Sequence, residues 1–458
     1  MAKKIAIFGG SFNPPGLHHI KIVQELRKIF DEIFIVPCGP RPDKETVNDV
    51  SPIHRAVMVD MAFGNLPNVK ISLLDLEKET FTRTQELQKI FQSYGDVWHA
   101  IGTDLIDGGA DGKSFIQRAW HNGVEIWNNL QFVVIPRGNI RFDKNNCPPK
   151  SRVIDLRISG SSSEIREKVF KHQCISRLVV PEIEKYIVRY GLYRGRFPAT
   201  CAPFVLDEPR LLIKVDKNNA KAFEIASKLR KLNVGLNNPN LIAVIGGDGT
   251  MLHAVRNDWR KRLPFFGINI GHRGFLLNNT GDDIEELFKR ELVVHQLPLL
   301  SVEITGADSN KKQALAFNDV WMERKSGQSA WLQVKINGIT RIAKLVGDGI
   351  LLSTMSGSTG YAKAMGAAPL SEDSSDLVLV GSNVMEPANW KSANLPGNSI
   401  LKIDALNTDK RPVEVFVDGI SQGRAIAFAA KASRIACAEL VFSQFYDISE
   451  KRLRLQFQ

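Results

Sequence analysis

The chain has 458 residues, more than one small hydrophobic core can organise, so two or three domains are expected. Its 43% hydrophobic and 24% charged residues are typical of a globular protein and exclude a disordered or collagen-like chain. The net charge of +11 is spread evenly along the chain, which fits binding of anionic phosphates as well as it fits nucleic acid or a merely basic surface. Five scattered cysteines without a C-x-x-C pair argue against a disulfide framework and a structural zinc site.

The start of the chain and its apolar segments indicate the compartment. Residues 1–4 lead directly into a strand-like run, which leaves no room for a signal peptide. No apolar run approaches membrane-spanning length. These features predict a cytoplasmic protein that does not bind a membrane. As partners we expect small molecules rather than nucleic acid.

Strand-like and helix-like segments alternate along the first part of the chain. Strands are predicted at residues 5–8, 33–36, 69–74, 97–101 and 132–135, and helices at residues 17–30, 53–63 and 82–91. This alternation predicts an α/β fold with a Rossmann-like parallel sheet that has helices on both faces. Ligands of such sheets bind beyond the carboxyl ends of the strands.

A glycine-, proline- and arginine-rich segment at residues 191–198 indicates a domain boundary. We therefore expect a first domain over residues 1–196 and a second over residues 203–458. Within the second, an α/β piece over residues 203–292 is followed by β-rich segments over residues 293–458, which predict an antiparallel β domain.

A Gly-Gly pair follows an apolar, strand-like run at two places in the chain. Residues 9–10 follow the first predicted strand, and residues 246–247 follow an apolar run at residues 241–245. A strand, a glycine turn and a helix start form a phosphate cradle, because unpaired backbone N–H groups and the helix dipole point at the anion. Histidines follow the first pair and an aspartate follows the second, which suggests two phosphate reactions of different kinds.

Several blocks in residues 3–194 resemble the nicotinate/nicotinamide mononucleotide adenylyltransferases of the nucleotidyltransferase α/β-phosphodiesterase superfamily. The blocks are the glycine loop at 9–14, the R-x-x-M helix at 55–58, the aromatic-threonine block at 80–84, the G-x-D-x-L strand end at 101–105, the segment at 133–138 and the serine-rich segment at 158–166. The resemblance implies adenylyl transfer from ATP to nicotinamide mononucleotide (NMN) or nicotinate mononucleotide, with release of pyrophosphate. Positioning and charge stabilisation suffice for this reaction, so no protein nucleophile is expected.

The resemblance also assigns roles to residues of this domain. His19 would be catalytic, donating to the α-phosphate of ATP as charge develops. Ser162 and Ser163 would bind the β- and γ-phosphates, although the Ser161-x-x-Glu164 spacing equally predicts a helix cap, and both can hold. The expected ATP- and mononucleotide-binding residues are Gly9, Gly10, Ser11, Phe12, His18, Asp104, Arg137, Ser162, Ser163 and Arg166.

One position departs from the pattern of this family, which has H-x-G-H or T-x-x-H where this chain has Gly16-Leu17-His18-His19. Two interpretations follow. His18 substitutes for the missing histidine, or the site is weakened and the domain is a nucleotide sensor that has lost catalysis.

The second glycine pair opens the sequence Gly-Gly-Asp-Gly-Thr at residues 246–250, and the chain lacks the G-x-x-x-x-G-K-[ST] motif of P-loop enzymes. Three further blocks, at residues 266–276, 317–319 and 347–361, are similar to those of NAD kinases, so the resemblance covers residues 205–458. It implies that Asp248 is the base, or the orienter, for the adenosine 2′-hydroxyl of NAD. Two alternatives are a lipid or sugar kinase, based on Gly-Gly-Asp-Gly alone, and a merely structural Asp248 in a glycine turn.

By the same resemblance, the expected NAD- and ATP-binding residues are Gly246, Gly247, Gly249, Thr250, Phe275, Asn318, Asp319, Asp348, Thr359 and Tyr361. Mg²⁺ is expected to enter with ATP, bound by its phosphates rather than by metal ligands of the protein. The β domains of this family pair, so a homo-oligomer is expected. The whole chain is then predicted to be a bifunctional enzyme that makes NAD and phosphorylates it to NADP. Such a fusion is economical if the first product feeds the second reaction, which favours NMN over nicotinate mononucleotide.

Overall fold

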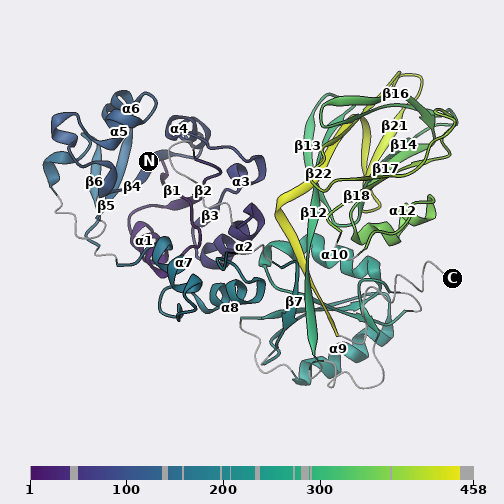
Figure 1. The fold of residues 1–458 in the computed structure, drawn as a ribbon, viewed down its shortest axis with the longest axis horizontal. Helices are drawn as coiled ribbons and strands as arrows, with labels where there is room; N and C mark the ends of the chain where they lie inside the picture. The colour runs from purple at the N-terminus through teal and green to yellow at the C-terminus, as the bar shows by residue number, and fades with distance from the viewer. Residues whose placement is uncertain are drawn as a thin grey trace. The chain divides into compact units, whose positions relative to one another are not determined.

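The computed structural model describes residues 2–41, 50–136, 143–156, 159–195, 199–206, 208–232, 238–271, 274–279, 288, 291–371 and 374–443. Its contacts divide the chain into two compact units, Met1–Ala199 and Thr200–Gln458 (Figure 1). In the described part of the chain, no helix combines the length and the apolar character needed to cross a membrane.

Unit 1 is built on a six-stranded sheet in which all neighbours are parallel, in the order β3-β2-β1-β4-β5-β6. The strands are β1 (Lys4–Gly10), β2 (Glu32–Pro37), β3 (Val69–Ile71), β4 (Asp96–Gly102), β5 (Gln131–Ile135) and β6 (Ser151–Val153). The predicted Rossmann-like sheet is thus confirmed. The direction of strand addition reverses between β1 and β4, and such a switch point is where open α/β sheets bind their ligands.

The helices of unit 1 are α1 (Leu17–Leu26), α2 (Pro52–Phe63), α3 (Leu74–Lys78), α4 (Thr84–Phe91), α5 (Phe115–Ala119), α6 (Gly123–Asn129), α7 (Ser162–Phe170) and α8 (Pro181–Tyr190). Two predicted boundaries were wrong. The strand predicted at residues 69–74 ends at Ile71, because it pairs only with β2, and α3 begins three residues later. The helix predicted at residues 17–30 ends at Leu26, after which hydrogen bonds that span three residues, from Lys28 and Ile29, interrupt the four-residue pattern.

Unit 2 begins with a small α/β part. The strands β8 (Leu211–Val215), β9 (Leu241–Gly246), β10 (Phe265–Asn269) and β11 (Asn278–Asn279) lie parallel in this order. They are accompanied by the helices α9 (Ala220–Leu232) and α10 (Asp248–Asp258), and β7 (Cys201–Phe204) pairs with a strand of the following β domain. All six residues of β9 are buried, as expected for a central strand of a parallel sheet.

The rest of unit 2 is the predicted antiparallel β domain. Its elements are β12 (Leu292–Gly306), β13 (Lys311–Ala316), β14 (Asp319–Arg324), β15 (Ala330–Ile336), β16 (Ile339–Gly347), β17 (Gly349–Ser353), α12 (Tyr361–Ala364), β18 (Leu377–Ser382), β19 (Ala393–Leu395), β20 (Leu401–Ala405), β21 (Val413–Val417) and β22 (Ile420–Ser443). The two long strands β12 and β22 pair antiparallel and run from the α/β part into the β domain (Figure 1). The end of β22 also pairs in parallel with β10, so the two parts of unit 2 share one hydrogen-bonded network.

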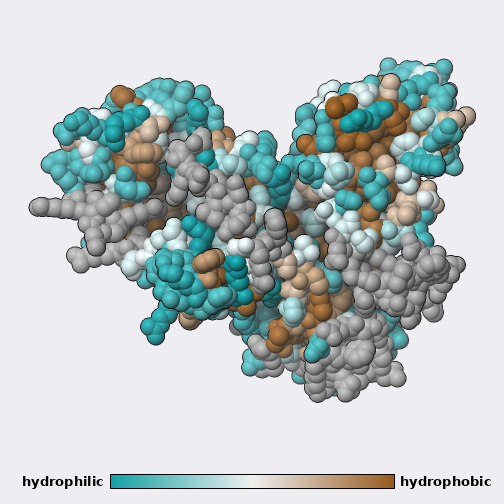
Figure 2. Space-filling model, viewed as in Figure 1, coloured by the Kyte–Doolittle hydropathy of each residue, from teal (hydrophilic) through white to brown (hydrophobic). Residues whose placement is uncertain are grey.

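The β domain also exposes apolar side chains, and hydrophobic residues are visible on its surface in Figure 2. Its exposed large hydrophobic residues are Ile339, Tyr361, Met385, Ile400 and Ile420.

Candidate functional sites

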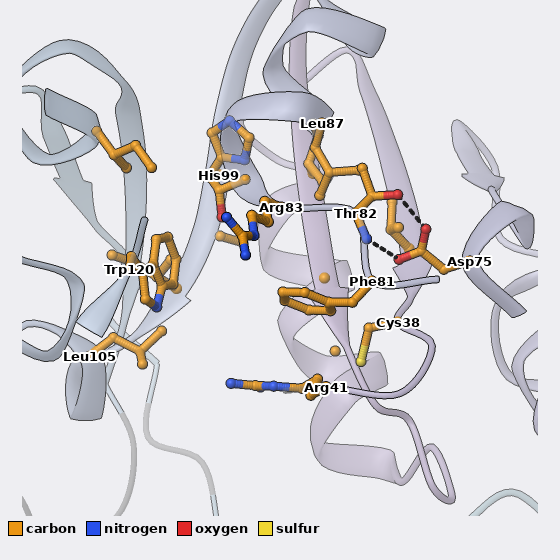
Figure 3. Close-up of a pocket in the computed structure, with 18 of the residues that line it drawn as sticks. Cys38, Arg41, Asp75, Phe81, Thr82, Arg83, Leu87, His99, Leu105 and Trp120 are labelled. Carbon is orange, nitrogen blue, oxygen red and sulfur yellow. Dashed lines mark hydrogen bonds between the residues drawn. The ribbon is translucent and has the colours of Figure 1, made fainter. Parts of the chain in front are cut away.

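The first candidate site is a cavity of about 400 Å³ at the switch point of the unit 1 sheet. The carboxyl ends of β1 and β4 contribute to its lining, and Gly9 and Gly10 are among the lining residues. Figure 3 shows Phe81 and Trp120 on opposite sides of the cavity, with Arg41 and Arg83 extending from the Phe81 side toward Trp120. A cavity of this size holds a small molecule, and its aromatic walls and guanidinium groups suit a planar ring that carries phosphate.

Three hydrogen bonds organise the polar wall of this cavity. The Asp75 carboxylate accepts from the backbone N–H of Thr82 at 3.0 Å and also from the Thr82 hydroxyl (Figure 3). The Nε2 of His99 lies 2.9 Å from the Oε1 of Gln88, and burial lowers the pKa of His99 to about 4. His99 is therefore neutral at pH 7 and donates from Nε2, because Gln88 presents an oxygen.

The loop over residues 10–16, which follows β1, is anchored by side chains from the end of unit 1. The Tyr193 hydroxyl donates to Oδ1 of Asn13 at 2.6 Å, and Nη1 of Arg166 donates to the Asn13 carbonyl at 2.7 Å. The hydroxyl of Ser162 donates to the Pro14 carbonyl at 2.8 Å. Ser162 and Arg166 therefore use part of their donor capacity to hold the loop that follows the first glycine pair.

His19 lies at the first turn of α1, where its ring is oriented by the backbone. The N–H of Gly16 donates to Nδ1 of His19 at 3.0 Å, which assigns the proton of the neutral ring to Nε2. His18 and His19 lie ring against ring, with centroids 3.9 Å apart. His19 can thus donate from Nε2 to a phosphate oxygen, as its predicted role requires.

The ring of His18 fills the space beside Gly16. A Cβ atom at position 16 would lie 2.7 Å from Nδ1 and Cε1 of His18 and 2.9 Å from Cδ1 of Ile165. Nδ1 of His18 is also 3.6 Å from the corresponding Cβ position of Gly160, in the serine-rich segment. Because position 16 is a glycine in this chain, the ring of His18 can occupy the space beside it.

The other predicted residues of unit 1 are placed differently. The ring of Phe12 is 1% exposed and packs in the core against Phe8 and Phe63, so it supports the loop from inside. Ser11 and Asp104 are exposed, and Ser163 accepts from Arg166 at 3.2 Å. Ser161 caps α7 by accepting from the N–H of Glu164. Arg137 lies outside the described residues.

The polar residues that line the cavity include several to which the sequence assigned no site role, among them Arg41, Asp75, Thr82, Arg83 and His99. Thr82 and Arg83 belong to the aromatic-threonine block, which was a usable signal. The others have no local pattern, because different elements bring them to the same edge of the sheet.

The second candidate site is the glycine turn between β9 and α10. Gly246 is the last residue of β9, Gly247 is the N-cap and Asp248 opens the helix. Gly246 has no room for a side chain, because the side chain of Thr250 packs against it. In the described structure nothing lies within 4 Å of a Cβ position at Gly247 or Gly249, so the turn is open on that side, as a phosphate cradle requires.

Asp248 is held by two backbone groups from a different segment. Its Oδ1 accepts from the N–H of Leu276 at 2.8 Å and its Oδ2 from the N–H of Phe275 at 3.0 Å. Phe275 therefore contributes to this site through its backbone, while its half-buried ring packs on the core of unit 2. Both carboxylate oxygens keep further lone pairs, which a substrate hydroxyl can use.

The segment at Asn318 and Asp319 opens β14. The Asn318 carbonyl accepts from the N–H of Thr354 at 2.8 Å, and the turn at Gly357 packs so closely on that carbonyl that a Cβ atom would not fit. The side-chain Oδ1 of Asn318 is buried and has no hydrogen-bond partner among the described residues. Burial, together with the neighbouring carboxylate of Asp418, raises the pKa of Asp319 to about 7.

Three predicted residues lie further along the β domain. The carboxylate of Asp348 accepts from Nε of Arg324 at 2.6 Å and from Nδ2 of Asn383 at 2.7 Å, so both of its oxygens already have partners. The ring of Tyr361 contacts that of Trp321, with centroids 3.9 Å apart and planes at 67°. Thr359 is half-buried in a short turn (Ser356–Thr359) that directly precedes α12.

Comparisons with known proteins agree with this two-part arrangement. Residues 7–168 match the family model described as Cytidylyltransferase-like, and residues 217–295 match that of the ATP-NAD kinase N-terminal domain. The NAD kinase of Rickettsia bellii is 30% identical over 247 residues, which are 53% of this chain and 96% of that protein. The NAD kinase of Rickettsia felis is 31% identical over 243 residues, which are 52% of this chain and 94% of that protein.

Among solved structures, yeast NADH kinase complexed with NADH is similar with a TM-score of 0.42 and 15% identity, covering 78% of this chain and 86% of that one. An NAD kinase from Archaeoglobus fulgidus in complex with ATP gives a TM-score of 0.42 and 22% identity, covering 54% of this chain and 97% of that one.

The sequence relatives favour an NAD kinase over the lipid- or sugar-kinase alternative. The predicted fusion of two domains is also confirmed, because the two family matches fall on separate parts of the chain. The chain belongs to the NAD kinase family, and it carries a nucleotidyltransferase-like domain at its N-terminal end.

Proposed function

We propose that unit 2 transfers a phosphoryl group from ATP to the adenosine 2′-hydroxyl of NAD, giving NADP. The observation that carries this proposal is the Asp248 carboxylate, which two backbone N–H groups hold at the start of α10, beside the open glycine turn. From there it can orient the hydroxyl and accept its proton, while the helix N-terminus stabilises phosphate charge.

The buried Oδ1 of Asn318 supports NAD as the acceptor. A buried acceptor without a partner costs free energy, and a hydroxyl or amino group of the dinucleotide would supply the missing donor. We also propose that Mg²⁺ enters with ATP and is held mainly by its phosphates. When bound, that ion would neutralise phosphate charge during transfer.

For unit 1 we propose adenylyl transfer from ATP to NMN or nicotinate mononucleotide, giving the dinucleotide and pyrophosphate. Phe81 and Trp120 can receive the pyridine ring between them, while Arg41 and Arg83 can receive its phosphate. His19 would donate from Nε2 to the α-phosphate of ATP. Only the reaction with NMN gives NAD, the proposed substrate of unit 2, and this favours NMN as the substrate of unit 1.

Incubation of the full chain with NMN, ATP and Mg²⁺, with NAD and NADP followed over time, tests both activities. We expect NAD to appear first and NADP to follow. If NADP forms only from added NAD, unit 1 is the nucleotide sensor of the alternative interpretation. A parallel reaction with nicotinate mononucleotide tests the substrate, and a strong preference for it would remove the argument that the first product feeds the second reaction.

We also propose that the β domains pair in a homo-oligomer. The exposed apolar side chains of this domain, Ile339, Met385, Ile400 and Ile420, support this proposal. Light scattering on the purified chain measures its mass in solution, and a monomer across micromolar concentrations would contradict it.

A further inference from the structure

The tight turn between β21 and β22 places a buried carboxylate against the kinase site. β21 ends at Val417 and β22 begins at Ile420, so Asp418 and Gly419 form a two-residue hairpin loop, both with positive φ (47° and 75°). Asp-Gly is a typical sequence for such a turn. The side chain of Asp418 is nevertheless only 2% exposed, which a turn aspartate does not require.

The Asp418 carboxylate binds a segment that lies 99 to 101 residues earlier in the chain. Its Oδ2 accepts from the N–H of Phe317 at 2.9 Å, and its Oδ1 accepts from the N–H groups of Asn318 at 2.8 Å and Asp319 at 3.2 Å. In the opposite direction, the Asp418 N–H donates to the Asp319 carbonyl at 3.0 Å. The backbone of the Asn318–Asp319 segment is thus positioned by the turn.

The same carboxylate also meets the helix that begins at the glycine cradle. Nη2 of Arg256, two turns along α10 from Asp248, lies 3.6 Å from Oδ2 of Asp418. A buried carboxylate is tolerated only when hydrogen bonds and an opposite charge compensate the loss of water, and Asp418 has both. One side chain therefore connects the hairpin, the segment proposed to bind NAD and the helix that carries Asp248.

We infer that Asp418 is a positioning residue of the kinase reaction: it holds Asn318 and Asp319 in the geometry that binds NAD and joins them, through Arg256, to α10. This inference rests on the proposed NAD kinase activity of unit 2. It assigns a function to a turn that the sequence presents only as a hairpin.

The arrangement has an electrostatic consequence that can be measured. Burial and the negative charge of Asp418 together raise the pKa of Asp319 to about 7. Among the described residues, Asp418 from the hairpin and Tyr361 from α12 interact electrostatically with Asp319, and Arg256 from α10 lies against Asp418. Removing Asp418 should lower the pKa of Asp319, whereas removing Arg256 should raise it by leaving Asp418 uncompensated.

The test uses the full chain and measures KM for NAD and kcat for NADP formation between pH 5.5 and 9. In the wild type, KM should fall as pH rises through the ionisation of Asp319, because an ionised carboxylate accepts from ribose hydroxyls. Asp418→Asn should raise KM about tenfold while kcat changes less, because it loses an acceptor for the segment. The inflection in the plot of KM against pH should move by about 1 pH unit in both variants, to lower pH in Asp418→Asn and to higher pH in Arg256→Gln.

Asp404→Asn is the matched control, because it removes a carboxylate from β20 of the same domain that is paired with Lys335 and Lys402. Its profile should superimpose on that of the wild type. Profiles of Asp418→Asn and Arg256→Gln that match this control would overturn the inference. If Asp418→Asn does not fold, the upward shift in Arg256→Gln decides, since that variant keeps the hydrogen bonds.

A failure of the proposed function would be visible separately. If the wild type makes no NADP from NAD and ATP, the proposed function fails. The titration of Asp319 is then followed by ¹³C NMR of the aspartate-labelled chain, with Asp319→Asn to assign its signal. The two opposite shifts are still expected there, and their absence would refute the role of Asp418.

Discussion

The carboxylate of Asp248 and the backbone N–H of Leu276 form a hydrogen bond of 2.8 Å between the start of α10 and the segment that follows β10. The second oxygen makes a similar bond to Phe275. These partners lie 27 and 28 residues away in the chain, so the two bonds tie the glycine turn to a distant segment. The bonds fix the direction in which the carboxylate faces, which is what a group that orients a hydroxyl requires.

Asp248→Asn should lower NADP formation by about 100-fold or more while NAD formation by unit 1 is spared. The amide cannot act as a base, and its Nδ2 cannot accept from a backbone N–H. Both products are quantified by chromatography of one reaction, and the melting temperature shows whether the variant is folded. Undiminished NADP formation by the folded variant would show that Asp248 is not the base.

His19→Asn and His19→Gln should distinguish the role of the Nδ1 acceptor of His19 from that of its Nε2 donor. Asparagine can place an oxygen where Nδ1 accepts from Gly16 but loses the Nε2 donor, whereas glutamine can place an N–H near Nε2. We expect His19→Asn to lower NAD formation from NMN by about 100-fold or more, and His19→Gln to lose less. NADP formation from added NAD is the internal control and should be unchanged. Equal losses in both variants would argue against donation from Nε2.

Gly16→Ala should impair adenylyl transfer by displacing the ring of His18. The backbone of Gly16 (φ −115°) is accessible to alanine, so the effect comes only from the new Cβ, which would lie 2.7 Å from the His18 ring. Such overpacking costs about 1–3 kcal/mol. Gly327→Ala is the control, because no described atom lies within 4 Å of that Cβ position. If both variants make NAD at the wild-type rate, the ring of His18 has no role at this position.

Asp319→Asn should stabilise unit 2 more at pH 8 than at pH 5. The folded pKa of Asp319 is about 7, against an ordinary value of 3.8, so the folded state binds more protons between these values and stability falls as pH rises through this window. The ionisation of Asp319 lowers the free energy of unfolding of the wild type at pH 8 by about 4 kcal/mol at most. Urea denaturation at the two pH values measures it, and an equal effect at both would contradict the shifted pKa.

Asp404→Asn should show the opposite dependence in the same measurement. Burial acts to raise the pKa of Asp404, but the ion pairs with Lys335 and Lys402 hold this pKa below its ordinary value. The stability that this carboxylate contributes is present above its ordinary pKa and is lost as pH falls. The variant should therefore be less stable than the wild type at pH 8, with a difference that shrinks toward pH 3.

Local patterns explain why much of the fold was predictable. The apolar run at residues 5–8 is long enough to cross a buried sheet, and the observed strand continues through Gly9 and Gly10, which also pair with β2. The β-rich region expected over residues 293–458 contains the strands Gly349–Ser353 and Val413–Val417, whose apolar residues lie between turn-forming segments. At residues 69–74 the prediction was wrong because pairing with a single neighbour, rather than hydrophobicity, determines where β3 ends.

By itself, the sequence determined the order of the two domains, the two glycine turns after strands and the position of Asp248 at the second turn, because each depends on neighbouring residues. Only the tertiary structure decided which groups those turns face. It placed His18 in the space beside Gly16, Arg41 and Arg83 at one cavity, and Asp418 under a segment about a hundred residues before it. These contacts join residues far apart in the chain, and they depend on how strands and helices pack rather than on any local pattern of residues.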